Sequence, residues 1–181
     1  MSRLSESSVI NIKNKSHSVT AEIEVPHAGA HGVVIAQGGA FGGWVLYANQ
    51  GELKYCHNFI GLQRFTIGSE GSIPAGKHQV RMEFTYAGGG LAKGGDVRLY
   101  VDGAQVGDGQ LPATVPLVFS GDETTDLGKD TGSSVSDDYT SEESLFSGIV
   151  NWVQLDIDDA AEDLDHLISP EERLRIAMAK Q

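Results

Sequence analysis

A period-two alternation of apolar and polar residues restricts the fold of this chain more than any other feature. The clearest case is residues 80–86, where Val80, Met82 and Phe84 alternate with polar and charged residues. Residues 19–25 show the same pattern. Because successive side chains of a strand point to opposite faces, this spacing predicts half-buried strands rather than helices.

Glycine and Asx residues separate these short segments, as expected for turns between strands. The chain holds 23 glycines, and Asp102-Gly103 is typical of a two-residue hairpin turn. Further β-type segments are predicted at 32–37, 44–49, 54–60, 63–68, 97–101, 105–107 and 146–157, with a short apolar run at 116–120. About ten or more antiparallel strands predict an all-β, jelly-roll sandwich that forms one domain over residues 1–158.

Residues 159–181 differ from the rest of the chain. They begin as an acidic tail, and the run 169–172 (SPEE) then supplies an N-cap, a proline at the first helical position and a capping-box glutamate. Leu174, Ala177 and Met178 would share one face of the helix that follows. We expect an acidic tail and a short C-terminal helix, packed on the sandwich as an appendage.

Charge and cysteine content limit the partners and the compartment. With 25 Asp and Glu against 13 Lys and Arg, the formal net charge is -12, which opposes binding to nucleic acid or to an anionic membrane. No run approaches the roughly 18 apolar residues of a spanning helix. Cys56 is the only cysteine, so no intramolecular disulfide forms. Since the N-terminus also lacks a signal-peptide pattern, we expect a cytoplasmic protein.

Three segments together resemble the laminin-G and concanavalin-like sandwich pattern. They are residues 76–84, residues 97–103 with the Val106-Gly107 pair that follows, and residues 146–149 leading to 153–155. The order and spacing of the three segments carry the resemblance, which implies a concanavalin-like sandwich.

A closer resemblance covers nearly the whole chain. Its segments are 34–39 (VIAQGG), 41–44 (FGGW), 46–47 (LY), 55–59 (YCHNF), 61–62 (GL), 122–126 (DETTD) and 137–139 (DDY). They look like the region C-terminal to the catalytic domain in large bacterial arylsulfatases. The resemblance implies an accessory sandwich domain that works with a sulfatase catalytic domain, on the same chain or a separate one.

The chain departs from that family at the catalytic motif. Sulfatases carry a Cys or Ser in a C/S-x-P-x-R context, which is converted to a formylglycine nucleophile. Cys56 is followed by HNFI, and the segment 72–76 (SIPAG) has the proline but ends in glycine. The metal-binding segments of the catalytic half have no room here either. We therefore expect no catalytic residues and no enzyme activity from this chain alone, only a part in a sulfuric ester hydrolase assembled with a catalytic domain.

The loop 122–143 is rich in carboxylates. Calcium takes six to eight oxygen ligands, which irregular loops supply readily, and glycines at 121, 128 and 132 would let carbonyls turn inward. The spacing matches no EF-hand. Two interpretations stay open, a solvated acidic loop and a calcium site. The ligands of the calcium site would be Asp122, Asp126, Asp130, Asp137 and Asp138.

A carbohydrate-binding face is the second candidate site. Aromatic side chains on strands can form a platform for a sugar ring, and neighbouring amides can hydrogen-bond its hydroxyls. The alternative for aromatic residues is core packing. The platform would consist of Trp44, Tyr47, Tyr55 and His57.

The sequence therefore leaves three functions to compare. The resemblance implies a non-catalytic accessory domain of an arylsulfatase. The alternatives are a calcium-assisted carbohydrate-binding module and a small glycan-active hydrolase. A hydrolase would use a carboxylate pair two residues apart on one strand face, such as Glu22 with Glu24 or Asp156 with Asp158. The competing interpretation is that these pairs form the solvent sides of amphipathic strands.

Overall fold

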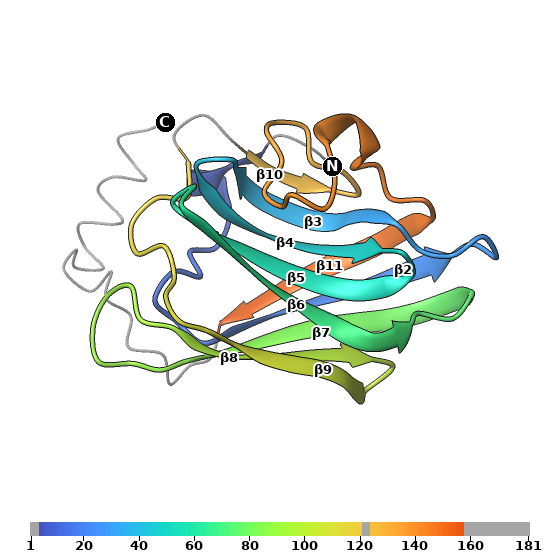
Figure 1. Cartoon of the computed structure of the whole chain (residues 1–181), viewed down its shortest axis with the longest axis horizontal. Helices are drawn as coiled ribbons and strands as arrows, with labels where there is room; N and C mark the ends of the chain where they lie inside the picture. Colours follow the sequence, from blue (N-terminus) through green and yellow to red (C-terminus); the bar gives the residue numbers. More distant parts are fainter. Residues whose placement is uncertain (1–3, 121–123, 158–181) are drawn as a thin grey trace.

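The computed structural model describes residues 4–120 and 124–157, which form two antiparallel sheets (Figure 1). The six-stranded sheet has the order β1 (Leu4–Ser5), β10 (Thr124–Leu127), β3 (Gly32–Gly39), β4 (Gly42–Asn49), β5 (Glu52–Phe59) and β6 (Gln63–Ser72). The five-stranded sheet has the order β11 (Ile149–Ile157), β2 (His17–Val25), β7 (Gly76–Tyr86), β8 (Gly95–Val101) and β9 (Ala104–Leu111). Two short 3-10 helices, η1 (Glu6–Ser8) and η2 (Ser141–Glu143), complete the described elements. The all-β sandwich is confirmed.

The main core lies between the two sheets and follows from the alternation. Val19, Ala21 and Ile23 of β2 are fully buried, as are Val80 and Met82 of β7. β2 and β7 pair in register, Val19 with Met82 and Ala21 with Val80, so the two sets of apolar side chains face the same side. Truncating a core side chain such as Met82 to alanine costs about 2–5 kcal/mol in proteins generally.

The six-stranded sheet departs from the pattern of one buried face. All residues of β3 and nearly all of β4 are buried, whichever way they point. This burial on both faces is explained by a second, smaller apolar cluster on the outer face of the sheet. The cluster consists of Val33, Ala36, Val45, Tyr47, Cys56 and Val135, with Tyr139 packed against them. The outer face of β3, β4 and β5 is therefore covered by chain from the 128–145 region, rather than open to solvent.

Several boundaries differ from the sequence-based prediction. β1 and β10 were not expected, and β10 lies inside the stretch interpreted as loop. The apolar run 116–120 is not part of the core throughout, since its Leu117 and Val118 are exposed. The last strand begins at Ile149 rather than at Phe146. The predicted C-terminal helix lies outside the described residues, so the division at residue 158 stays a prediction. No helix in the described part of the chain is long and apolar enough to cross a membrane.

Two histidines are buried at the end of the sandwich where β2 begins. Val115 donates its backbone N–H to Nε2 of His57 at 3.1 Å. Nδ1 of His17 lies 3.0 Å from the carbonyl oxygen of Lys15, whereas its Nε2 has no hydrogen-bond partner. Burial lowers the pKa of His17 from 6.5 to about 4. Burial, with repulsion from His17, lowers the pKa of His57 to about 3. Both rings are therefore neutral at pH 7.

We predict that acid destabilises the fold through these histidines. Between pH 6.5 and about 4 the unfolded chain binds protons at His17 that the folded chain does not, so the free energy of unfolding falls as pH falls. Each unit of pKa difference is worth about 1.4 kcal/mol. Urea unfolding between pH 7.5 and 4.5 measures this slope. His17→Asn, whose amide can still donate to Lys15, should flatten the slope, and the exposed control His27→Asn should not. Equal slopes in all three proteins would contradict the assignment.

Candidate functional site

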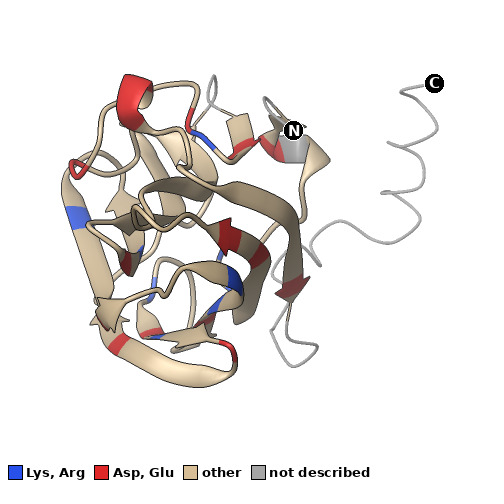
Figure 2. Cartoon of the chain, turned by 90° about the vertical axis from the view of Figure 1, so that its right-hand side faces the viewer, with Lys and Arg blue, Asp and Glu red and all other residues tan. Residues whose placement is uncertain are grey.

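The loop that the sequence marks as acidic covers the outer face of the six-stranded sheet. We call residues 128–145 the lid. Backbone hydrogen bonds fasten it at both ends, from Gly128 N–H to the Val34 carbonyl at 2.9 Å and from Val33 N–H to the Ser144 carbonyl at 2.8 Å. Val135 of the lid is fully buried against the sheet. In Figure 2, η2, which belongs to the lid, carries acidic residues at the top of the view.

Carboxylates hold the lid in place from within. Asp130 is buried, and its Oδ2 accepts hydrogen bonds from the Tyr139 hydroxyl at 2.8 Å and the Val135 N–H at 3.2 Å. Oδ2 of Asp138 accepts from the Tyr47 hydroxyl at 2.7 Å and from Lys54 Nζ at 3.0 Å. The Tyr47 and Lys54 hydrogen bonds lower the pKa of Asp138 despite the burial that raises it. These groups satisfy donors that the lid would otherwise leave unpaired.

The expected calcium site has no support among the described residues. Asp126 Oδ2 accepts from the backbone and hydroxyl of Thr131, and Asp137 is largely exposed with Arg64 at 3.4 Å. Asp122 lies outside the described residues. Over 4–120 and 124–157, no three His, Cys, Asp or Glu side chains gather as a metal site would require. The carboxylates that can be placed act as hydrogen-bond and ion-pair acceptors for this chain.

The expected aromatic sugar platform is buried, so the structure corrects that prediction. Trp44 and Tyr55 belong to the main core, where the Trp44 indole N–H donates to Oε1 of Gln37 at 2.9 Å. His57 faces Phe119 in the same core. Tyr47 points to the opposite face, under the lid. None of the four offers an aromatic face to solvent, because each face of β4 and β5 is covered.

A hollow of about 400 Å³ opens beside the lid. Its polar lining comes from the sheet and from the lid, and consists of His31, Tyr47, Asn49, Asp138, Tyr139 and Glu143. Tyr47 and Asp138 thus meet, although the sequence assigned them to two different sites. Because the Tyr47 hydroxyl and Asp138 are hydrogen-bonded to each other, these two groups hold the lid on the sheet rather than face a ligand.

The outer face of the five-stranded sheet is more open. Trp152, Gln154 and Asp156 of β11 pair with Glu22, Thr20 and Ser18 of β2, which point away from the core residues of that strand. A bulge at Asn151 places Trp152 on this face, where it is 39% exposed. Arg81 and Glu83 of β7 continue the same rows. These strands together present a polar surface with one exposed indole.

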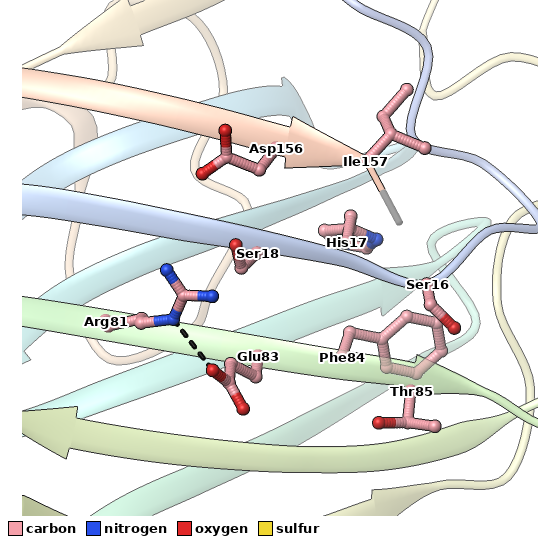
Figure 3. Close-up of a pocket in the computed structure, with 9 residues that line it drawn as sticks. All are labelled: Ser16, His17, Ser18, Arg81, Glu83, Phe84, Thr85, Asp156 and Ile157. Carbon is pink, nitrogen blue, oxygen red and sulfur yellow. Dashed lines mark hydrogen bonds and ion pairs between the residues drawn. The ribbon is translucent and has the colours of Figure 1, made fainter. Parts of the chain in front are cut away.

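A hollow of about 330 Å³ lies at one end of this face, where β11 ends and β2 begins (Figure 3). Ser18, Arg81, Glu83 and Asp156 line it with hydroxyl, guanidinium and carboxylate groups. Arg81 Nε donates to Glu83 at 2.8 Å, and its NH1 donates to Thr20 at 3.0 Å. Figure 3 shows Asp156 on the far side of Ser18 from the Arg81–Glu83 pair. The hollow therefore offers both donors and acceptors.

The sequence pattern indicates part of this surface but not all of it. Glu22, Glu24 and Asp156 do lie on the solvent side of their strands, as the competing interpretation held; Asp158 lies outside the described residues. Arg81 and Glu83 were overlooked, although they occupy the polar positions of the clearest alternating strand. Trp152 carried no recognisable signal, because the bulge reverses the alternation just before it.

We predict that Asp130→Ala lowers the free energy of unfolding by about 3 kcal/mol, because it leaves the partly buried hydroxyl of Tyr139 and the buried N–H of Val135 without an acceptor. The matched control is Asp137→Ala, which removes an exposed ion pair and should cost less than about 1 kcal/mol. Urea denaturation of the two variants makes the comparison. Equal stability of the two would show that the lid does not depend on Asp130.

Comparison with known proteins defines the fold. A search of family models found no match, and a search of curated proteins found none either. The CBM40 of the Ruminococcus gnavus IT-sialidase, solved with α2,3 sialyllactose, has a TM-score of 0.54 at 12% identity, over 79% of this chain and 76% of that one. Mouse laminin α1 domains LG4-5 have a TM-score of 0.54 at 14% identity, over 86% of this chain and 39% of that one.

A third structure has the same architecture. The leech intramolecular trans-sialidase, complexed with 2,7-anhydro-Neu5Ac, has a TM-score of 0.53 at 12% identity, and the match covers 86% of this chain and 23% of that one. At such identities the likeness concerns the fold alone. None of the three is a sulfatase, so the arylsulfatase resemblance stays a prediction. The chain is a sandwich of the concanavalin and laminin-G type.

Proposed function

We propose that this chain is a non-catalytic glycan-binding domain and that the outer face of the five-stranded sheet is its binding surface. The observation that carries the proposal is the row formed by Trp152, Gln154 and Asp156 on β11, which runs from an exposed indole into the polar hollow. An indole supplies an apolar face on which a pyranose ring can stack. The groups beside it hydrogen-bond hydroxyls.

The dimensions of the surface fit an oligosaccharide rather than a single sugar. Trp152 and Asp156 are four residues apart on one strand, which is about 13 Å at 3.3 Å per residue. A sugar stacked on Trp152 would thus be followed by one or two further units before the hollow. Gln154 lies between the two points, on the same face, with its side-chain amide donating to Asp156 at 2.8 Å.

The charges favour a neutral, hydroxyl-rich ligand. Arg81 is the only lysine or arginine among the described residues that line the hollow, and it already pairs with Glu83. Asp156 adds a second carboxylate. An acidic sugar would have to separate Arg81 from Glu83 to pair with the guanidinium. A neutral sugar could hydrogen-bond both side chains while they remain paired. The Ruminococcus CBM40, solved with sialyllactose, supports glycan as the ligand class. That ligand is acidic, so the preference for a neutral glycan is inferred from Arg81, Glu83 and Asp156 of this chain alone.

The proposal assigns binding without catalysis for two reasons. The surface is an open sheet face, and catalytic groups work best in sites that exclude water. The sequence also lacks the C/S-x-P-x-R motif of a sulfatase. A partnership with a sulfatase catalytic domain is compatible with this role, because a domain that holds the neutral units of a glycan would bring sulfated units of the same polymer to that enzyme. Co-purification with a separately expressed catalytic domain tests the partnership, and failure of the two proteins to associate would count against it.

We predict that Trp152→Ala weakens glycan binding at least tenfold, because it removes the stacking surface. A panel of neutral and acidic oligosaccharides identifies the ligand, and calorimetry then compares the variants. Arg81→Ala should weaken binding as well, through the lost donor. Leu145→Ala is the matched control, since it removes an exposed apolar side chain on the lid. Unchanged affinity of Trp152→Ala, with an unchanged unfolding midpoint, would place the glycan elsewhere or exclude it.

We also predict that calcium does not raise the unfolding midpoint of chelator-treated protein. The carboxylates that would bind it already accept donors from the chain. A ligand at about 100 times its dissociation constant adds about 2.7 kcal/mol. For a domain of this size that is a rise of roughly 5–10 °C. Thermal unfolding with and without millimolar calcium measures this, and a rise of that size would contradict the prediction and establish a cation site.

A further inference from the structure

Large apolar side chains are exposed at one end of the sandwich, on turns that ordinarily carry polar residues. Phe41 lies in the β3–β4 turn and is 77% exposed, and Ile60 and Leu62 lie in the β5–β6 turn, where Leu62 is 75% exposed. Leu117 and Val118 are exposed on the segment before Phe119. We call these five residues the apolar pole. Contiguous exposed apolar surface of this kind marks an interaction site in soluble proteins.

The three segments of the apolar pole touch one another. Asn58 ties the two turns together, since its Nδ2 donates to the carbonyls of Gly39 at 2.8 Å and Ala40 at 3.1 Å, while its Oδ1 accepts from Gly61 N–H at 3.0 Å. A Cβ on Gly42 would lie 2.7 Å from the carbonyl oxygen of Phe119 and 3.7 Å from Cα of Ile60. The pole is therefore one surface built from three parts of the chain.

The backbone at Ile60 is held in an unfavourable conformation. Its φ is 46°, in the left-handed region that β-branched residues rarely adopt. Glycine or asparagine would fit this turn at less cost. The described part of the chain leaves 46% of Ile60 exposed, so its side chain is only partly packed at this strained position. The apolar side chain is therefore better explained by a contact that the described residues do not make.

The described chain ends at the same end of the sandwich as the apolar pole. Ile157, its last residue, pairs with His17 at the start of β2. His17 lines a small internal cavity together with Trp44, His57 and Phe119, and Phe119 directly follows Leu117 and Val118 of the apolar pole in the sequence. Figure 1 shows the β3–β4 turn, the β5–β6 turn and the end of β11 at the left-hand end of the molecule. The last described residue, Ile157, thus lies at the same end of the sandwich as the two turns.

We propose that residues 158–181 dock on the apolar pole. The segment is long enough, since the stretch that precedes the predicted helix can span more than 30 Å when extended. Its sequence also offers an apolar partner for the exposed side chains of the pole, because Leu174, Ala177 and Met178 are spaced to form a stripe on one face of a helix. The C-terminal segment would cover Phe41, Ile60 and Leu62, and so relieve the exposure of the turns.

Disulfide trapping in the full chain tests the contact. In Leu62→Cys/Leu174→Cys, mild oxidation should form an intramolecular disulfide in the monomer. In the control Ala104→Cys/Leu174→Cys it should not, because residue 104 follows the β8–β9 turn at the opposite end of the sandwich. The native Cys56 does not interfere, since its thiol is buried and burial raises its pKa. No disulfide in either protein would overturn the proposal.

A second variant distinguishes docking of residues 158–181 from docking of a second copy of the chain at the pole. Leu174→Asp/Met178→Asp should increase the binding of a hydrophobic fluorescent dye several-fold and speed hydrogen exchange in the two turns, while the protein remains monomeric and folded. Unchanged dye binding and exchange would overturn the proposal. A disulfide found only between molecules, together with a dimer that Leu62→Ser dissociates, would overturn it in favour of a second copy of the chain at the pole.

Discussion

Hydrogen bonds from two tyrosine hydroxyls, one on the sheet and one on the lid, to carboxylates of the lid hold the lid on the six-stranded sheet. Tyr47 on β4 and Tyr139 on the lid both direct hydroxyls at aspartates, Asp138 and Asp130, while their rings meet at 5.6 Å between centroids. These bonds allow a polar, acidic loop to lie on an apolar sheet face. Without them the second apolar cluster, on the outer face of β3, β4 and β5, would be exposed to solvent.

Covering one sheet leaves the other as the open face of the sandwich. The outer side of the five-stranded sheet keeps its polar rows from β11 to β9, with Arg81 and Glu83 near the middle. A binding surface on this sheet does not disturb the main core, because the side chains that would meet a ligand point away from it. The apolar pole lies on turns and on the segment before Phe119 rather than on either sheet face. A contact there would therefore not compete with a ligand on the five-stranded sheet.

The sequence predicted the fold better than the site, because the strands follow from local patterns whereas the site depends on contacts between residues far apart in the sequence. Alternation is local, so β2 and β7 could be recognised from Val19, Val80 and their neighbours. Burial of Tyr47 depends on residues about 90 positions away, as its bond to Ser136 shows. The acidic loop was recognised as unusual, but composition could not distinguish carboxylates that await a cation from carboxylates that accept tyrosine hydroxyls. β10 was missed because Thr124–Leu127 has too little apolar content to stand out.

The strand order has a consequence for how the protein is made. β2 is one of the first strands to be synthesised, yet one of its neighbours is β11, the last described strand. Until residue 157 has left the ribosome, one edge of β2 therefore has no partner, and unpaired edges invite pairing with other chains. Glu22 and Glu24 sit on this strand, on the face that stays in water. Charges at an edge discourage such pairing, so the nascent chain carries its own protection during translation.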